Sequence, residues 1–243
     1  MKKVCFLFWF LLSFSAYSQL EVKIDSIISN DSNKLKRKFS IAYHISNKTD
    51  KPLSFFLVPE SMIPNAASSM TLFVVYKIYQ NHIFQDMDGP FFERYIREAE
   101  LLEDFPDYNS PEATEIIKKI NEKYKAEYHL ILENYKNNRG TSTDESFIVR
   151  NYHLLKSKTT LQPGQTKAYT IKTSWNKIRT VNKGDLEYYL DENDHFDIEL
   201  VLDLKKSAFR EELSEKEFSE ITKDPNFIQG IFTSNKMKIN FGE

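Results

Sequence analysis

The chain has 243 residues, of which 41% are hydrophobic and 28% are charged. Its 33 Lys and Arg residues and 35 Asp and Glu residues are interspersed and give a formal net charge of −2. Nucleic acid is therefore not an expected partner, because binding it requires a basic surface that displaces counterions.

Residues 1–18 have the layout of a cleavable secretory signal peptide. Lys2 and Lys3 precede a short apolar run at residues 4–14, and polar Gln19 follows soon after. A cationic start followed by such a run is typical of signal peptides, and the run is about half as long as a membrane helix of roughly 20 residues. We therefore favour a cleaved signal over an uncleaved membrane anchor.

The expected cleavage site lies between Ser18 and Gln19, because Ala16 and Ser18 supply the small side chains that a signal peptidase requires. The only cysteine, Cys5, would leave with the signal, so the mature chain would have neither a disulfide nor a lipoprotein-type anchor. A chain of this length can bury enough surface without disulfides. We expect an exported protein, periplasmic or secreted, with residues 19–243 as one domain and no membrane span.

Most of the mature chain alternates apolar and polar residues, which is typical of strands with one buried face. The alternation is clearest at residues 196–204. A short helix should begin at Ser214, because Ser214 and Glu217 can form a capping box. The expected strands are residues 20–24, 39–45, 53–58, 70–79, 82–84, 147–155, 169–175, 196–204 and 237–241.

Residues 91–138 show helical spacing and predict a helical hairpin inserted between strands. We expect a first helix over residues 91–105. Ser110 followed by Pro111 is a start signal for the second helix, because the serine can cap the helix and proline needs no partner in the first turn. Gly140 is well placed to end this helix.

Two turns carry a resemblance to a known fold. The polar turn at residues 47–52, and the LQPGQT sequence at residues 161–166 before a strand that ends at Trp175, resemble bacterial immunoglobulin-like domains. The resemblance covers about 100 residues and excludes the insertion. It implies a mainly β fold, an antiparallel immunoglobulin-like β-sandwich carrying the helical hairpin, with a role in binding, assembly or inhibition.

Motifs of common enzymes are absent from the sequence. A chain with six glycines has neither a Gly-x-Ser-x-Gly elbow nor a phosphate-binding glycine loop. We identify no catalytic residue, metal site or cofactor, and expect a non-enzymatic binding, inhibitory or accessory protein of the bacterial cell envelope. The alternative is a periplasmic or secreted hydrolase that acts on envelope or dietary polymers.

Two local patterns resemble metal sites. His129 and Glu133 would lie one helical turn apart, but zinc usually has three or four ligands, so we interpret the pair as part of a solvated helix face. Residues 191–197 offer oxygen ligands for calcium, but Phe196 stands where an EF-hand requires glycine. We interpret this stretch as a charged turn before a strand.

The helical insertion carries the candidate partner surface. Tyr124, Tyr128 and Tyr135 lie on the apolar stripe of its second helix, and an insertion of this length is too long for a simple connection. We favour packing of the stripe on the sandwich; any exposed part would be a surface for an envelope protein or a glycan. The aromatic residues that could form a glycan platform are Phe91, Phe92, Tyr95, Tyr188 and Tyr189.

Overall fold

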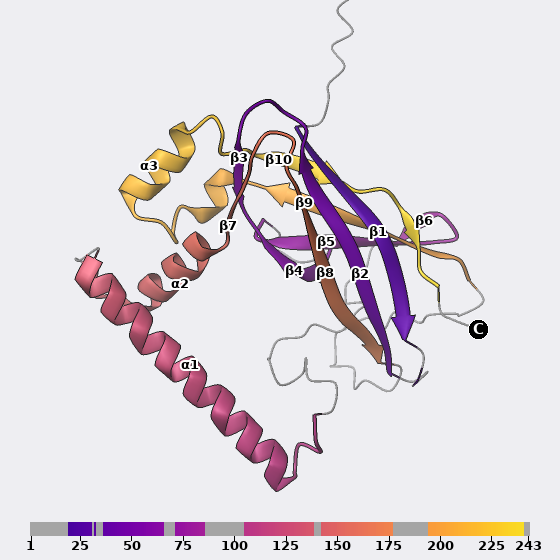
Figure 1. The fold of residues 1–243 in the computed structure, drawn as a ribbon, viewed down its shortest axis with the longest axis horizontal. Helices are drawn as coiled ribbons and strands as arrows, with labels where there is room; N and C mark the ends of the chain where they lie inside the picture. The colour runs from indigo at the N-terminus through magenta and orange to yellow at the C-terminus, as the bar shows by residue number, and fades with distance from the viewer. Residues whose placement is uncertain are drawn as a thin grey trace, which may run out of the picture.

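The computed structural model describes residues 19–30, 32, 36–65, 71–85, 105–138, 142–176 and 194–240. In these residues the protein is mainly β, with mostly antiparallel sheets and three α-helices (Figure 1). The predicted signal peptide, the predicted first helix up to residue 104 and the five aromatic residues of the possible glycan platform lie outside the described residues.

The strands and helices follow one another in a simple order. The strands are β1 (Leu20–Asn30), β2 (Lys36–Asn47), β3 (Leu53–Phe56), β4 (Val58–Pro64), β5 (Phe73–Gln80), β6 (Ile83–Gln85), β7 (Lys158–Leu161), β8 (Thr166–Asn176), β9 (Phe196–Leu204), β10 (Gly230–Thr233) and β11 (Met237–Lys238). Between β6 and β7 lie α1 (Pro111–Asn138) and α2 (Glu145–Lys156), and between β9 and β10 lie η2 (Lys206–Phe209) and α3 (Glu215–Lys223).

The strands form two sheets and a separate pair. One sheet has the order β1-β2-β8 and is antiparallel throughout. The other has the order β10-β9-β5-β4, with β6 paired to β5 and β11 paired to β9, and its β4–β5 pair is parallel. Strands β3 and β7 pair only with each other among the described strands. An immunoglobulin-like strand arrangement stays a prediction.

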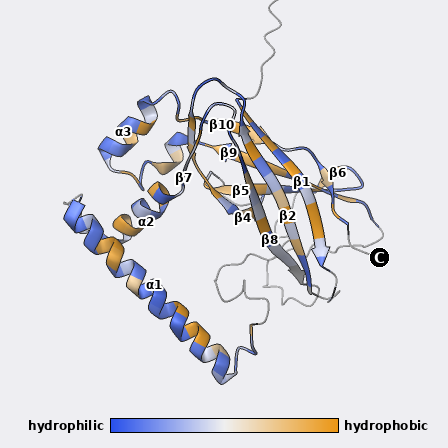
Figure 2. Cartoon of the chain, in the orientation of Figure 1, coloured by the Kyte–Doolittle hydropathy of each residue, from blue (hydrophilic) through white to orange (hydrophobic). Residues whose placement is uncertain are grey.

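Apolar side chains from both sheets meet in one buried core, and Figure 2 shows the alternation of hydrophobic and hydrophilic residues along the strands. Each fully buried aliphatic or aromatic side chain contributes about 1.5–3 kcal/mol to folding. The contacts between the sheets therefore supply most of the stability of the β part. The core includes Ile24, Ile41, Tyr43, Phe55, Tyr76, Ile78, Phe196, Ile198, Leu200 and Leu202.

Strand β9 is buried on both faces, which differs from the sequence-based prediction of a half-buried strand. Its even-numbered side chains enter the main core, as predicted. On the other face, Val201 packs in a small cluster with Ile63 and Val75. The acidic residues of this face are paired: Glu199 accepts a hydrogen bond from the Tyr79 hydroxyl at 2.9 Å, and Lys205 lies 2.5 Å from Asp203.

Most other predictions of secondary structure are confirmed. The predicted strand at residues 53–58 is divided between β3 and the start of β4, and the predicted last strand is shortened to β11. Helix α1 begins after Ser110, whose hydroxyl accepts a hydrogen bond from the Ala113 amide at 3.0 Å. The capping box of Ser214 and Glu217 is present at the start of α3.

The predicted strand at residues 147–155 is wrong, because this segment is helix α2. Asp144 caps the helix by accepting hydrogen bonds from the Ser146 and Phe147 amides. The buried residues Ile148, Asn151 and Leu154 are spaced by three, which is the spacing of a helix face. The β-branched residues Ile148 and Val149 favour a strand, but the Asp144 cap and the three-residue spacing favour a helix.

Helix α2 attaches α1 to the rest of the molecule. Leu154 packs in a second core with Phe56, Phe209 and other apolar residues of η2 and α3. Buried Asn151 donates hydrogen bonds to the Glu212 carbonyl and to the Glu217 carboxylate, each at 2.9 Å. The position of the α1–α2 pair is therefore fixed through α2 by apolar packing and by one buried amide.

Asn47 joins the two turns that carry the resemblance to immunoglobulin-like domains. Its buried side-chain amide donates to the carbonyl oxygens of Lys51, Leu161 and Gln162 at 2.7, 3.1 and 3.1 Å. Its Oδ1 accepts hydrogen bonds from the amide and hydroxyl of Thr49. One side chain thus holds the end of β2 against the β7–β8 turn.

Replacing Asn47 by alanine should lower the free energy of unfolding by about 3 kcal/mol, because it leaves several partly buried carbonyl groups without their donor. Urea denaturation of the purified protein measures this loss. Asn30→Ala is the control, because Asn30 is exposed and its side chain accepts a local hydrogen bond from the Ser32 amide, so it should change stability by less than about 0.5 kcal/mol. Equal effects would contradict a role for Asn47 in joining the turns.

Candidate functional site

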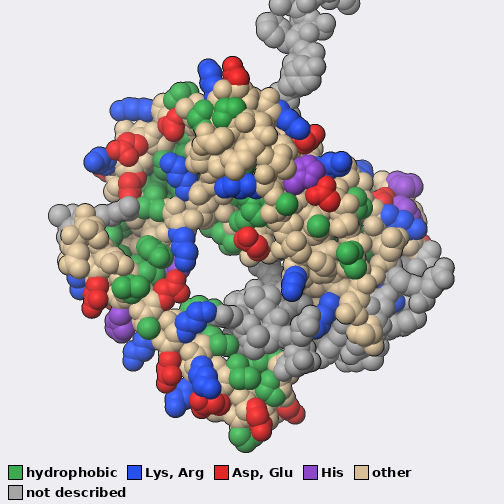
Figure 3. Space-filling model, in the orientation of Figure 1, with side chains coloured by type: hydrophobic (Ala, Val, Ile, Leu, Met, Phe, Trp, Pro, Cys, Tyr) green, Lys and Arg blue, Asp and Glu red, His purple; other side chains and the backbone are tan. Residues whose placement is uncertain are grey.

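Helix α1 projects from the β-sheets as an arm. Its 28 residues span about 42 Å, yet only Ala113, Ile131 and Leu132 are buried. In Figure 3 an opening separates the middle of α1 from the sheets, and hydrophobic side chains gather where α1 meets α2. At the C-terminal end of α1 the apolar stripe therefore packs on α2 rather than on the sheets.

A cavity of about 390 Å³ lies between α1 and α2. We call it the α1–α2 groove. Its size lies in the usual range for ligand sites, and its walls combine apolar side chains with a few amide groups, as such sites commonly do. The residues that line it are Ile131, Asn134, Tyr135, Asn138, Ile148, Asn151, Tyr152, Leu155 and Lys156.

The three tyrosines of the predicted partner surface lie in different environments. Tyr135 lines the groove and packs on the cluster of Ile131, Leu132 and Ile148. Tyr128 and Tyr124, about two and about three turns further toward the start of α1, are 36% and 48% exposed. The stripe thus continues from the groove onto an open helix surface.

Tyr128 also links the two helices. Its hydroxyl donates a hydrogen bond to Glu145 Oε2 at 2.7 Å, at the start of α2. This hydrogen bond to a carboxylate raises the pKa of the tyrosine above its usual value. Lys156 at the end of α2 lies 3.7 Å from Glu127 of α1, which adds an ion pair between the helices. Among the described helices, α1 included, none is long and apolar enough to cross a bilayer.

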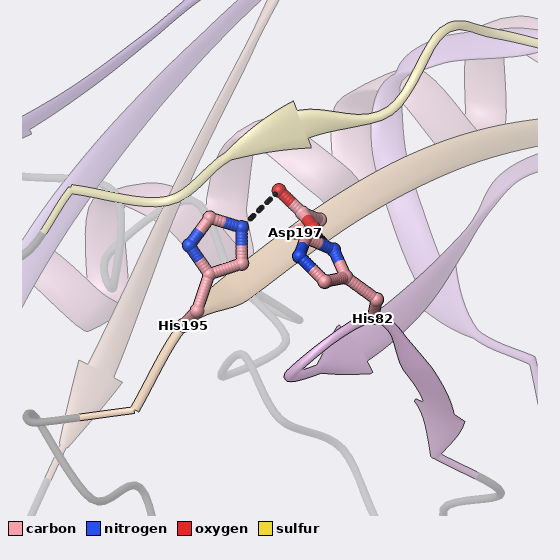
Figure 4. Close-up of side chains that lie close together, drawn as sticks. All are labelled: His82, His195 and Asp197. Carbon is pink, nitrogen blue, oxygen red and sulfur yellow. Dashed lines mark hydrogen bonds and ion pairs between the residues drawn. The ribbon is translucent and has the colours of Figure 1, made fainter.

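A second group of functional side chains lies at the β5–β6 hairpin. His82 Nδ1 is 3.2 Å from Asp197 Oδ2, and His195 Nε2 is 3.0 Å from Asp197 Oδ1. The imidazole rings lie side by side with centroids 4.8 Å apart, and all three side chains point toward one another (Figure 4). The carboxylate is mostly buried, whereas the His82 side chain is 79% exposed. We call these residues the His–Asp cluster.

The turn between β5 and β6 places His82 in this cluster. Asn81 and His82 are its two central residues, with φ of 49° and 69°. Two positive φ angles are required for the type I′ turn, whose twist matches that of paired strands. Asn and His adopt this left-handed region more readily than most residues, so the sequence suits the turn.

Asn81 fixes the hairpin against the start of β9. Its Oδ1 accepts from the His195 amide at 3.2 Å, and its own amide donates to the His195 carbonyl at 2.7 Å. Its side-chain NH₂ donates to Asp194 Oδ1 at 3.0 Å, and Gln80 donates to the other oxygen. These hydrogen bonds hold the pKa of Asp194 below its usual value, and the one from Asn81 has the largest effect.

Of the two sequence patterns considered for metals, His129 and Glu133 are both exposed on α1, and neither belongs to a cluster of three possible metal ligands in the described part of the chain. Residues 191–193 lie outside the described residues. From the rest of that stretch, the structure brings His195 and Asp197 together with His82.

Sequence reasoning missed His82. A partial signal existed, because His195 and Asp197 are two residues apart and share one face of a strand. The third member follows only from the pairing of β5 with β9, in which Gln80 lies opposite Phe196. That pairing joins segments more than 100 residues apart and is not visible in the local pattern.

Comparisons with known proteins give no relative. No protein-family model matches the chain, and no curated protein and no solved structure is significantly similar to it.

Replacing Asn81 tests the turn that supports the cluster. Asn81→Gly removes the side-chain hydrogen bonds but keeps the freedom to adopt positive φ, whereas Asn81→Ala also adds the strain of a left-handed backbone. The alanine variant should therefore be less stable than the glycine variant by about 1 kcal/mol, as measured by urea denaturation. Equal stabilities would contradict the left-handed turn.

Proposed function

We propose that this chain is an exported, non-enzymatic binding or accessory protein of the bacterial cell envelope, and that the α1–α2 groove binds a segment of a partner protein. The observation that carries the proposal is the groove itself, an open cavity beside an apolar stripe on a projecting arm. An exposed apolar surface of this kind, bordered by charged residues, is typical of an interaction site.

The lining of the groove favours a peptide segment over a glycan. Ile131, Ile148 and Leu155 provide aliphatic walls that suit an inserted apolar side chain. Asn134 and Asn138 offer amide groups near the same cavity that could pair with a peptide backbone. We therefore expect a partner that inserts an aliphatic or aromatic side chain between the helices and extends along α1 over Tyr128 and Tyr124.

The position of the His–Asp cluster relative to the α1–α2 groove also favours a binding role over the alternative, a hydrolase. The compact His–Asp cluster is at the exposed tip of the β5–β6 hairpin and does not line the α1–α2 groove. In Figure 1, helices α1 and α2 lie to the left of the sheets and strand β6 lies at the right. A hydrolase would need its acid and base groups beside the cavity that holds the substrate.

An immunoglobulin-like sandwich forms part of the proposal. Two mostly antiparallel sheets that share one apolar core support it, as does the junction that Asn47 makes between the two turns. Such a sandwich would serve as a rigid platform from which the helical arm projects. Export is supported by the position of β1, which begins at Leu20, so removal of the residues before Gln19 would leave both sheets intact.

Export predicts a defined mature end. When the full-length chain is produced in a bacterium with a general secretory pathway, the protein in the envelope or medium should begin at Gln19, as read by intact-mass spectrometry and N-terminal sequencing. Ala16→Tyr should leave the precursor uncleaved, because signal peptidase needs a small side chain there. An unprocessed wild-type chain in the cytoplasm would overturn the export proposal.

Photo-crosslinking in cells that produce the protein tests the groove. A photoreactive amino acid replaces Tyr152, which lines the groove and is 36% exposed, and in a separate strain replaces Ile231, which is 69% exposed on β10. Position 152 should crosslink to one envelope protein, and position 231 should not, because only the former lies at the proposed interface. Equal crosslinking from both positions would contradict a specific groove.

Binding measurements with the identified partner complete this test. Tyr152→Ala should weaken binding by about tenfold or more, because exposed aromatic residues commonly dominate interfaces. Tyr108→Ala is the matched control, because Tyr108 is 51% exposed but does not line the groove, and it should leave affinity unchanged. Binding of a glycan that depends on Tyr152, without a protein crosslink, would replace the protein partner by a glycan.

A further inference from the structure

We propose that His82, His195 and Asp197 bind a divalent transition-metal ion of the zinc type. This site is independent of the α1–α2 groove and of the function proposed for it. The cluster supplies two imidazole nitrogens and one carboxylate, whose ligand atoms all lie within 4.8 Å of one another. Three protein ligands with an open fourth position form a known arrangement for zinc.

The donor atoms decide the class of ion. Imidazole nitrogen suits Zn²⁺, Cu²⁺ and Ni²⁺, whereas Ca²⁺ and Mg²⁺ are bound by oxygen atoms. Two of the three ligands here are imidazoles, so a calcium site is not favoured at this position. Asp194, the other described carboxylate of residues 191–197, is already held by the side-chain amides of Gln80 and Asn81.

The distances fit such an ion. In a tetrahedral zinc site with bonds of about 2.0–2.2 Å, neighbouring ligand atoms lie about 3.3 Å apart. His82 Nδ1 lies 3.2 Å from Asp197 Oδ2 and His195 Nε2 lies 3.0 Å from Oδ1, so an ion between the rings would contact both carboxylate oxygens. The distance between the imidazole nitrogens can shorten by rotation of the His82 side chain, which is 79% exposed.

The site is also preorganised. Asp197 is fixed in the sheet, opposite Tyr79 of β5 and Lys238 of β11. The backbones of the hairpin and of His195 are joined through Asn81. The left-handed backbone of His82 directs its ring to the carboxylate. The backbone of the site is therefore ordered before an ion binds and only side-chain rotation remains, which favours affinity.

The other account of the cluster is a pair of hydrogen bonds between a carboxylate and two histidines. The chain contains a simpler example of such contacts, since His44 Nδ1 lies 2.8 Å from both oxygens of Asp25. That pair has one imidazole and offers too few ligands for zinc. The two accounts differ in one measurable property, which is stoichiometric binding of Zn²⁺ that requires both His82 and His195.

The test is calorimetric titration of Zn²⁺ into the full-length gene product, purified without a histidine tag. One ion should bind per chain with a dissociation constant in the micromolar range. His82→Asn should weaken binding by about tenfold or more, because it removes a ligand. Asn tolerates positive φ, so this variant should keep the turn and fold normally, which circular dichroism checks.

His129→Asn is the matched control, because His129 is exposed on α1 and does not belong to the His–Asp cluster. It should leave the affinity for Zn²⁺ unchanged, and His195→Asn should reproduce the loss seen with His82→Asn. Bound Co²⁺ should give the intense visible absorption of a tetrahedral site with nitrogen ligands. The proposal is overturned if wild type does not bind Zn²⁺, if His82→Asn binds as tightly as wild type, or if Ca²⁺ binds equally well.

Discussion

Strand β9 is packed on both of its faces, and this packing holds the rest of the structure in place. Its even-numbered side chains, such as Ile198 and Leu200, are fully buried against the β1-β2-β8 sheet. Of its odd-numbered side chains, Val201 packs on Val75, and Glu199 accepts a hydrogen bond from the Tyr79 hydroxyl. A slip of one residue would exchange the two faces and place carboxylates in the apolar core, so the register of β9 is strongly fixed.

This register also creates the His–Asp cluster. Because Gln80 pairs with Phe196, the β5–β6 turn lies beside the first residues of β9. Asp197 belongs to the polar face of the strand, and its carboxylate meets two imidazoles rather than water. The same apolar contacts that stabilise the fold therefore position these three side chains, and a substitution in the core that shifted β9 would also disturb the cluster.

Local patterns determined what could be predicted from the sequence. The alternation in β1, β2 and β9 and the capping box at Ser214 are signals within a few residues, and the structure confirms them. Helix α2 was missed because its β-branched residues favour a strand, and only the Asp144 cap and the three-residue spacing oppose that reading. The second buried face of β9 and the place of His82 depend on contacts between distant segments, which periodicity does not encode. The α1–α2 groove lies between consecutive helices and could not be predicted because residues 147–155 were expected to form a strand.

The groove and the His–Asp cluster depend on different parts of the core. The cluster rests on β5 and β9, whereas the groove rests on α2, which is held by Leu154 in the second core and by Asn151. Asn151 and the capping box use the same Glu217 carboxylate, so the start of α3 and the position of α2 are linked through one side chain. Because well-separated sites usually respond independently to substitution, a change in the cluster should leave the groove intact. The proposed metal binding and the proposed partner binding should thus be separable, so that one is lost while the other is retained.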